Sequence, residues 1–194
     1  GRIVEGYKIR RGVKQGDALS CVLFIMCMEP LLRNIEENPL IECIGSRELG
    51  QLPKVYAYAD DVNAVMVNNP ISVQELFNEY GRLTKASGLE LNADKTEIMR
   101  LNGMHQNRIT LNVNYANKNY LLDTREEIKI NGILFQQNEE KMRDANVEAV
   151  SKKINALLKK WSARHLSLLG KILIVKTFGI SQIVYLMQSI ALSN

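Results

Sequence analysis

The stretch that decides the fold is VYAYADDVNAVMV, from Val55 to Val67. Apolar residues flank a tight turn at Asp60-Asp61, and this pattern predicts two strands joined as a hairpin. Adjacent carboxylates in apolar surroundings repel each other unless a cation joins them. Their oxygens suit Mg²⁺, which typically takes one or two carboxylates and fills its other positions with water and phosphate oxygens. A plain Asp-Asp turn is the alternative interpretation, since aspartate is a common turn residue.

Helices are expected on both sides of this hairpin. An apolar run over residues 17–37 predicts a long helix, which Asp17 or Ser20 could cap and which Pro30 should kink or break. Apolar residues at helical spacing predict a second helix over residues 71–86. The order helix, hairpin, helix therefore brackets the paired carboxylates.

The remaining segments add strands and then a helical tail. We expect a strand at 2–10, a loop at 11–16, two or three strands within 108–136, and helical regions at 143–160 and 166–189, the last broken near Gly179. Mixed strands followed by helices favour an α+β fold.

The composition is that of an ordinary folded protein. Hydrophobic residues make up 46% and charged residues 24% of the 194 residues, which excludes wholesale disorder. The longest uninterrupted apolar run, Cys21–Met28, is far shorter than the roughly 20 residues that span a bilayer, so we expect no membrane partner. The three cysteines form no C-x-x-C pair, which argues against zinc and disulfide scaffolds and favours an intracellular, reducing compartment.

Charge is unevenly distributed along the chain. Residues 141–194 carry nine basic and two acidic side chains, whereas residues 1–140 carry 16 basic and 19 acidic ones. A basic tail beside a mildly acidic body indicates a polyanionic partner. A solvated helix face explains the same charges equally well.

Three motifs occur in order around the hairpin: RGVKQGDALS at 11–20, YADD at 58–61 and SGLELNADKTE at 87–97. Together they resemble the reverse transcriptases of non-LTR (LINE-like) retrotransposons. The tail WSARHLSLLGKI at 161–172 resembles the same group. Group II intron and retroviral enzymes share parts of the pattern.

The resemblance implies a polymerase right-hand architecture. Residues 1–140 would be a partial palm that lacks the first catalytic strand and the fingers, and residues 141–194 would be a helical thumb. The intact enzyme would be an RNA-directed DNA polymerase that adds deoxynucleotides to a primer 3′ end by two-metal phosphoryl transfer. It would use two Mg²⁺ ions, with Mn²⁺ as an alternative.

The implied partners are an RNA template, a DNA primer or RNA–DNA duplex, and deoxynucleoside triphosphates. Further domains of the same polyprotein, such as fingers and an endonuclease, are also implied. Enzymes of this group prime on chromosomal DNA, so the resemblance implies action in the nucleus.

The resemblance also assigns roles around the hairpin. Asp60 and Asp61 would be catalytic metal ligands, and Tyr58 and Ala59 would lie under the primer 3′ end. Lys95 would act near the departing pyrophosphate as a general acid or charge neutraliser; a solvated lysine after a turn is the alternative.

Other roles follow from the flanking motifs. Gln15 and Gly16, with Arg11, would line the nucleotide pocket. Asn131, Gly132 and Ile133 would form the hairpin that grips the primer. The phosphate contacts would come from the basic tail, namely Lys152, Lys153, Lys159 and Lys160.

The sequence departs from the family pattern at three places. Ala18 replaces the usual proline, and Asn131 replaces the usual leucine of the primer grip. The family also needs an aspartate on a strand that precedes the Gln15-Gly16 motif, and residues 1–194 contain no counterpart. We therefore expect the isolated chain to be inactive as a polymerase. The alternative is a decayed or domesticated module that binds RNA or duplex without chemistry.

Overall fold

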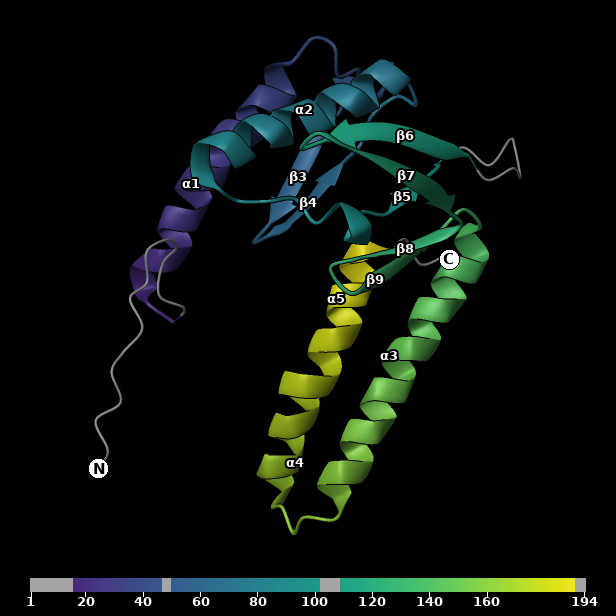
Figure 1. Ribbon diagram of the computed structural model, residues 1–194. Helices are drawn as coiled ribbons and strands as arrows, with labels where there is room; N and C mark the ends of the chain where they lie inside the picture. Colours follow the sequence, from purple (N-terminus) through teal and green to yellow (C-terminus); the bar gives the residue numbers. More distant parts are fainter. Residues whose placement is uncertain (1–15, 47–49, 102–108, 191–194) are drawn as a thin grey trace. The chain divides into compact units, whose positions relative to one another are not determined.

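The computed structural model describes residues 16–46, 50–101 and 109–190 (Figure 1). Helices and strands are mixed within these ranges, as the predicted α+β class requires. The elements in order are α1 (Ala18–Glu37), β1 (Gly45–Ser46), β2 (Gly50–Gln51), β3 (Val55–Tyr58), β4 (Asp61–Ala64), α2 (Pro70–Ser87), the 3₁₀ helix η1 (Ala93–Lys95), β5 (Ile98–Met99), β6 (Thr110–Tyr115), β7 (Lys118–Arg125), β8 (Glu127–Ile130), β9 (Ile133–Gln136), α3 (Glu139–Ser162), α4 (Leu168–Ile174), the π-helix η2 (Val175–Ile180) and α5 (Ser181–Ser189).

The chain divides into two compact units. Unit 1 contains the described residues up to Asp94 together with Asn112–Leu121, and unit 2 contains the described residues of 95–111 and those from Leu122 onward. The strand predicted at 2–10 and most of the loop at 11–16 lie outside the described residues. The boundary expected between palm and thumb, at residues 140 and 141, stays a prediction.

Helix α1 begins where the sequence indicated. The Leu19 N–H donates to the Asp17 side chain at 2.9 Å, so Asp17 caps the helix. Of the two outcomes predicted at Pro30, the break was wrong, because α1 continues through it to Glu37, and the kink stays a prediction. Residues on both sides of the proline pack into one core, which offsets the missing backbone hydrogen bond. These buried residues are Met28, Leu31 and Ile35.

The core of unit 1 lies between α1, α2 and the β3–β4 hairpin (Figure 1). Ile35 and Ile41 are almost completely buried at its centre. Half-buried side chains from the other elements pack against them, namely Phe24, Val55, Val62, Met66, Leu76, Tyr80 and Leu83. This core fixes the hairpin to the two helices.

Unit 2 contains a strand pair and a helical pair. Strands β8 and β9 form an antiparallel hairpin, and β5 pairs in parallel with the end of β7, Ile98 with Thr124 and Met99 with Arg125. Helix α3 and the helical stretch α4–η2–α5 lie side by side (Figure 1). The break predicted near Gly179 was wrong, because the chain stays helical there as the π-helix η2.

Two helices in the described ranges are long and apolar enough to cross a membrane by length and composition alone. They are Ala18–Glu37 and Leu168–Ser189, with mean hydropathies of 1.5 and 1.4. Polar residues interrupt the apolar runs within these helices. Each uninterrupted run is therefore short, although the mean hydropathy of the whole helix is high. Helix α1 contributes three residues to the core of unit 1, and 22% of its apolar window is buried, against 6% for Leu168–Ser189. The expected absence of a membrane partner stays a prediction.

Removing the Ile35 side chain tests the role of this core. Ile35→Ala should lower the free energy of unfolding by about 2–5 kcal/mol, because a fully buried side chain leaves a cavity. Ile25→Ala on the same helix is the matched control, since Ile25 is 61% exposed and should change stability by no more than about 0.5 kcal/mol. Chemical denaturation measures both, and equal losses would contradict the proposed core.

Candidate functional site

The paired carboxylates lie at the tip of the β3–β4 hairpin. The strands are antiparallel, and Tyr58 pairs with Asp61 next to the turn. The predicted strand–turn–strand order is confirmed, but the predicted turn position was wrong by one residue. Ala59 and Asp60 form the turn, and Asp61 is already the first residue of β4.

Ala59 adopts a strained backbone conformation in this turn. Its φ of 54° is left-handed, a conformation that non-glycine residues avoid because Cβ approaches a neighbouring carbonyl. The cost is of order 1–2 kcal/mol. Strained residues of this kind persist where the surrounding structure holds them, and they cluster at functional sites. Here the pairing of Tyr58 with Asp61 on the two sides holds the turn closed.

The hairpin is half-buried where it packs on the core and exposed at its tip. Val55 and Val62 pack toward the core of unit 1, whereas Asp60 and Asp61 are exposed and Tyr58 is 69% exposed. Solvent therefore screens the two carboxylates more than their apolar flanks suggested.

These carboxylates form a small donor set for a metal. Within the described ranges, no group of three or more His, Cys, Asp or Glu side chains could hold an ion. Two hard oxygen donors fit Mg²⁺, because that ion commonly takes only one or two protein carboxylates and keeps water and substrate phosphates.

Among the three residues expected in the nucleotide pocket, only Gly16 is described. It is exposed with φ 88°, directly before the Asp17 cap of α1. This conformation suits glycine, because a Cβ would be strained there even though it would meet no neighbour within 4 Å. Arg11 and Gln15 lie outside the described residues.

The SGLELNADKTE motif begins at the end of α2. Gly88 is left-handed at φ 75°, and its N–H donates to the Thr84 carbonyl at 2.8 Å, so Gly88 ends the helix. The Tyr115 hydroxyl then accepts from the Leu91 N–H at 2.9 Å and shares a 2.7 Å hydrogen bond with Thr84. Tyr115 thus holds the loop after α2, a role that its place in an alternating strand did not reveal.

Lys95 is the last residue of η1 and belongs to unit 2. Asp60 and Asp61 belong to unit 1. The approach of Lys95 to the carboxylates therefore stays a prediction.

The candidate primer grip is the turn between β8 and β9. Asn131 and Gly132 both have positive φ, at 48° and 88°. Two left-handed residues in a two-residue hairpin turn match the type I′ geometry, for which Asn-Gly is the preferred pair. Asparagine tolerates this conformation better than leucine does, which gives a local reason for the departure at Asn131.

This turn packs on the helical pair of unit 2. Ile133 is buried with Leu186 and Ile190 of the C-terminal helix. A cavity of about 280 Å³ lies beside the turn. Its lining includes Asn131, Gly132, Ile133, Asn146, Lys153 and Tyr185. The structure thus brings together the three predicted primer-grip residues and one predicted phosphate contact, Lys153.

The four predicted phosphate-binding lysines are exposed on α3. Lys152 forms an ion pair with Glu148, and its Nζ lies 2.6 Å from Glu148 Oε1. The hydrogen bond from Lys152, and next its charge, lower the pKa of the Glu148 carboxyl. The other three predicted phosphate-binding lysines are Lys153, Lys159 and Lys160.

Six apolar residues recur at helical spacing along α3, namely Val147, Val150, Ile154, Leu157, Leu158 and Trp161, a pattern that predicts one apolar stripe. Four of these six positions, Val150 and Ile154 among them, are half-buried. Val147 and Leu158, by contrast, are exposed at 41% and 39%. The Arg164 guanidinium lies 4.6 Å from the Trp161 ring centroid, a cation–π contact at the end of the helix.

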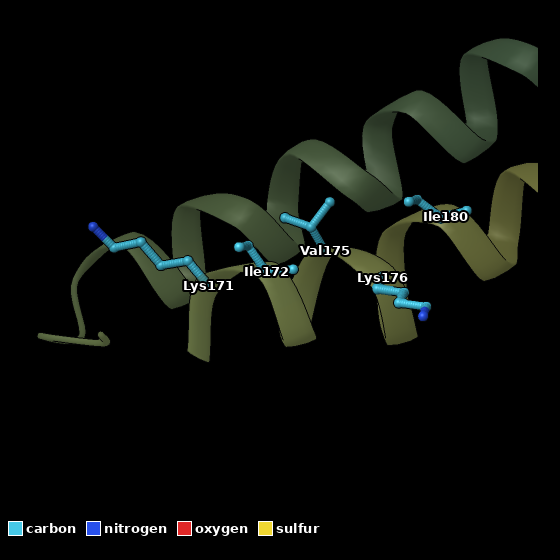
Figure 2. A pocket seen from close by; sticks show the side chains of 5 residues that line it. All are labelled: Lys171, Ile172, Val175, Lys176 and Ile180. Carbon is cyan, nitrogen blue, oxygen red and sulfur yellow. The ribbon is translucent and has the colours of Figure 1, made fainter. Parts of the chain in front are cut away.

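A hollow of about 430 Å³ lies on the α4–η2 stretch, and Figure 2 shows the side chains that line it. Ile172, Val175 and Ile180 form its apolar part, and Lys171 and Lys176 complete the lining (Figure 2). The neighbouring leucines are strongly exposed, with Leu168 at 74% and Leu169 at 78%. No motif in the sequence predicts this hollow.

Comparison with known proteins identifies the class. Residues 1–170 match the family model described as reverse transcriptase (RNA-dependent DNA polymerase), so the chain belongs to the reverse transcriptase family. This membership implies a polymerase palm-type fold, and the family generally uses divalent metal ions.

Two curated relatives narrow the class. Over 107 residues the chain is 32% identical to the Retrovirus-related Pol polyprotein from type-2 retrotransposable element R2DM of Drosophila melanogaster. Over 89 residues it is 34% identical to the corresponding polyprotein from type-1 retrotransposable element R2 of Popillia japonica. The matches cover 55% and 45% of this chain but only 10% and 12% of the relatives. The predicted membership of the non-LTR reverse transcriptases is confirmed.

Proposed function

We propose that this chain forms part of the palm and the thumb of a non-LTR reverse transcriptase. The intact enzyme adds deoxynucleotides to a primer 3′ end on an RNA template. The observation that carries this proposal is the β3–β4 hairpin, which presents Asp60 and Asp61 at an exposed tip and packs half-buried strand residues against the core of unit 1. The family match over residues 1–170 supports the reaction class.

In this proposal Asp60 and Asp61 hold Mg²⁺, or Mn²⁺ in its place. When bound, the two ions of the intact enzyme neutralise charge on the phosphates and lower the pKa of the primer hydroxyl. The protein supplies mostly position, since phosphoryl transfer needs alignment and charge stabilisation more than covalent chemistry. The closed turn at Ala59 keeps the two carboxylates at one end of the hairpin.

The other residues bind and orient the substrates. Tyr58, exposed beside the turn, and Ala59 support the primer end. Gly16, with Arg11 and Gln15, lines the nucleotide pocket. Lys95 neutralises the departing pyrophosphate or protonates it.

The thumb holds the template–primer duplex. The Asn131–Gly132 turn contacts the primer, and the α3 lysines contact backbone phosphates. Lys153 lies at the same cavity as the turn, which supports a joint role. Lys152 would exchange its Glu148 partner for a phosphate.

The isolated chain of 194 residues should show no polymerase activity. The further aspartate that the family requires has no counterpart in residues 1–194. Incorporation of labelled deoxynucleotides on a primed RNA template measures this, with an active reverse transcriptase as the positive control. Template-dependent incorporation by the purified chain would contradict the prediction.

Asp60→Asn in an intact enzyme that contains this chain should stop Mg²⁺-dependent primer extension. Metal-centred charge stabilisation is worth several kcal/mol, so the rate should fall by at least about a thousandfold. Template–primer affinity should change little, because phosphate contacts dominate it. Extension and binding are measured in parallel.

Asp144→Asn is the matched control, since Asp144 is an exposed aspartate on α3. It should keep wild-type extension. Wild-type extension by Asp60→Asn would show that Asp60 is no metal ligand. Binding without extension in the unmutated intact protein would instead favour the non-catalytic RNA- or duplex-binding module.

Reversing the charge of Lys152 and Lys159 should weaken binding of an RNA–DNA hybrid. Removing one phosphate interaction should flatten the plot of log affinity against log salt by about 0.9 on B-DNA, so the slope should fall too. The weakening should be similar for all sequences, because phosphate contacts carry no base information. Both the charge-reversed and the wild-type chain are titrated with a labelled hybrid across a salt series, and thermal melts check folding.

Lys85→Glu combined with Lys118→Glu is the control for net charge. Both lysines are exposed in unit 1, and the change in total charge is the same. An unchanged affinity and slope for the Lys152 and Lys159 variant, with the fold intact, would mean that this face of α3 is only solvated.

A further inference from the structure

The Asn131–Gly132 turn is tied to two helices by polar side chains that the proposed function does not yet use. Asn146 on α3 and Tyr185 on α5 both hydrogen-bond the backbone of the β8–β9 hairpin. They lie 12 residues from Leu134 and 54 residues from Asn131 along the chain. No local motif therefore explains either contact.

Asn146 binds β9 as a neighbouring strand would. Its Nδ2 donates to the Leu134 carbonyl at 2.7 Å, and its Oδ1 accepts from the Leu134 N–H at 2.9 Å. A second Nδ2 hydrogen bond goes to the Met142 carbonyl at 2.7 Å and fixes the side chain on its own helix. Asn146 is only 5% exposed, so both outward-facing backbone groups of Leu134 are satisfied away from water.

Tyr185 binds the turn itself. Its hydroxyl donates to the Asn131 carbonyl at 2.6 Å, while the residue is 45% exposed. The next residue, Leu186, is buried with Ile133 just after the turn. One helix thus holds the turn through an apolar contact and a hydrogen bond.

We infer that Asn146 and Tyr185 are positioning residues that fix the primer-grip turn on α3 and α5. The turn and Lys153, which line one cavity, then meet the primer with a constant spacing. This inference rests on the proposed function, because that function makes the primer the ligand of the turn. It adds two residues that act through the turn and need not touch nucleic acid themselves.

The role of Asn146 is tested first without nucleic acid. In the 194-residue chain, Asn146→Ala should speed hydrogen exchange of the Leu134 amide by about tenfold, the factor expected for removal of one hydrogen bond. Exchange in the β3–β4 hairpin should not change. An unchanged Leu134 exchange rate would overturn the role of Asn146.

Tyr185→Phe tests positioning on a ligand. The probe is an RNA template annealed to a DNA primer that carries 4-thiothymidine at successive distances from its 3′ end. Cross-links from the wild-type turn should concentrate at one primer position, and in Tyr185→Phe they should spread over neighbouring positions. Affinity should change by less than about twofold, because the phosphate-binding lysines remain. A merely structural role would lower affinity and melting temperature together.

Tyr120→Phe is the matched control, because it removes a tyrosine hydroxyl from unit 1. It should leave the cross-link pattern unchanged. A wild-type pattern in Tyr185→Phe would overturn the inference and leave the proposed function standing. No cross-link from the wild-type turn would overturn both. If Asn146→Ala fails to fold, the Tyr185→Phe variant at an exposed residue still tests the inference.

Discussion

The burial of α1 against the β3–β4 hairpin is the interaction on which the candidate site depends. Ile35 and Ile41 lie almost wholly out of water, and Val55 and Val62 pack against their cluster from the two strands. A two-stranded hairpin alone is only marginally stable in water. The apolar contact therefore provides what the hairpin lacks, and it leaves the tip with Asp60 and Asp61 free to project into solvent.

Both hairpins have left-handed backbone in their turns, but different residues adopt it. The β8–β9 turn uses Asn131 and Gly132, which tolerate a left-handed backbone, and so it forms with little strain. The β3–β4 turn places Ala59 in that conformation, where glycine would be easier. The relaxed turn is also the one that distant side chains tie down. The strained one relies on strand pairing and on the core beneath it.

The charges of unit 2 fit a surface that meets a polyanion. The lysines of α3 are exposed, and the Glu148 carboxylate binds only one of them closely, at 2.6 Å from Lys152. An exposed ion pair contributes little to stability, so a phosphate can compete for the lysine at small cost. The apolar hollow that Val175 lines lies on the other helix of the pair, and Lys171 and Lys176 are among its lining residues (Figure 2). Exposed basic side chains therefore lie on both α3 and the α4–η2 stretch.

Local chemistry alone determined a large part of this protein. The sequence predicted the hairpin within Val55–Val67, a cap at Asp17 or Ser20, the second helix over residues 71–86 and the family, because these signals act within a few residues or through ordered motifs. Only the tertiary structure decided that α1 passes Pro30 unbroken, since packing on both sides outweighs the local penalty. The structure also has Ala59 and Asp60 in the turn, in place of the predicted Asp60 and Asp61, and both carboxylates are exposed to solvent. The hydrogen bonds of Asn146 and Tyr185 join residues 12 and 54 positions apart, a distance over which sequence periodicity carries no information.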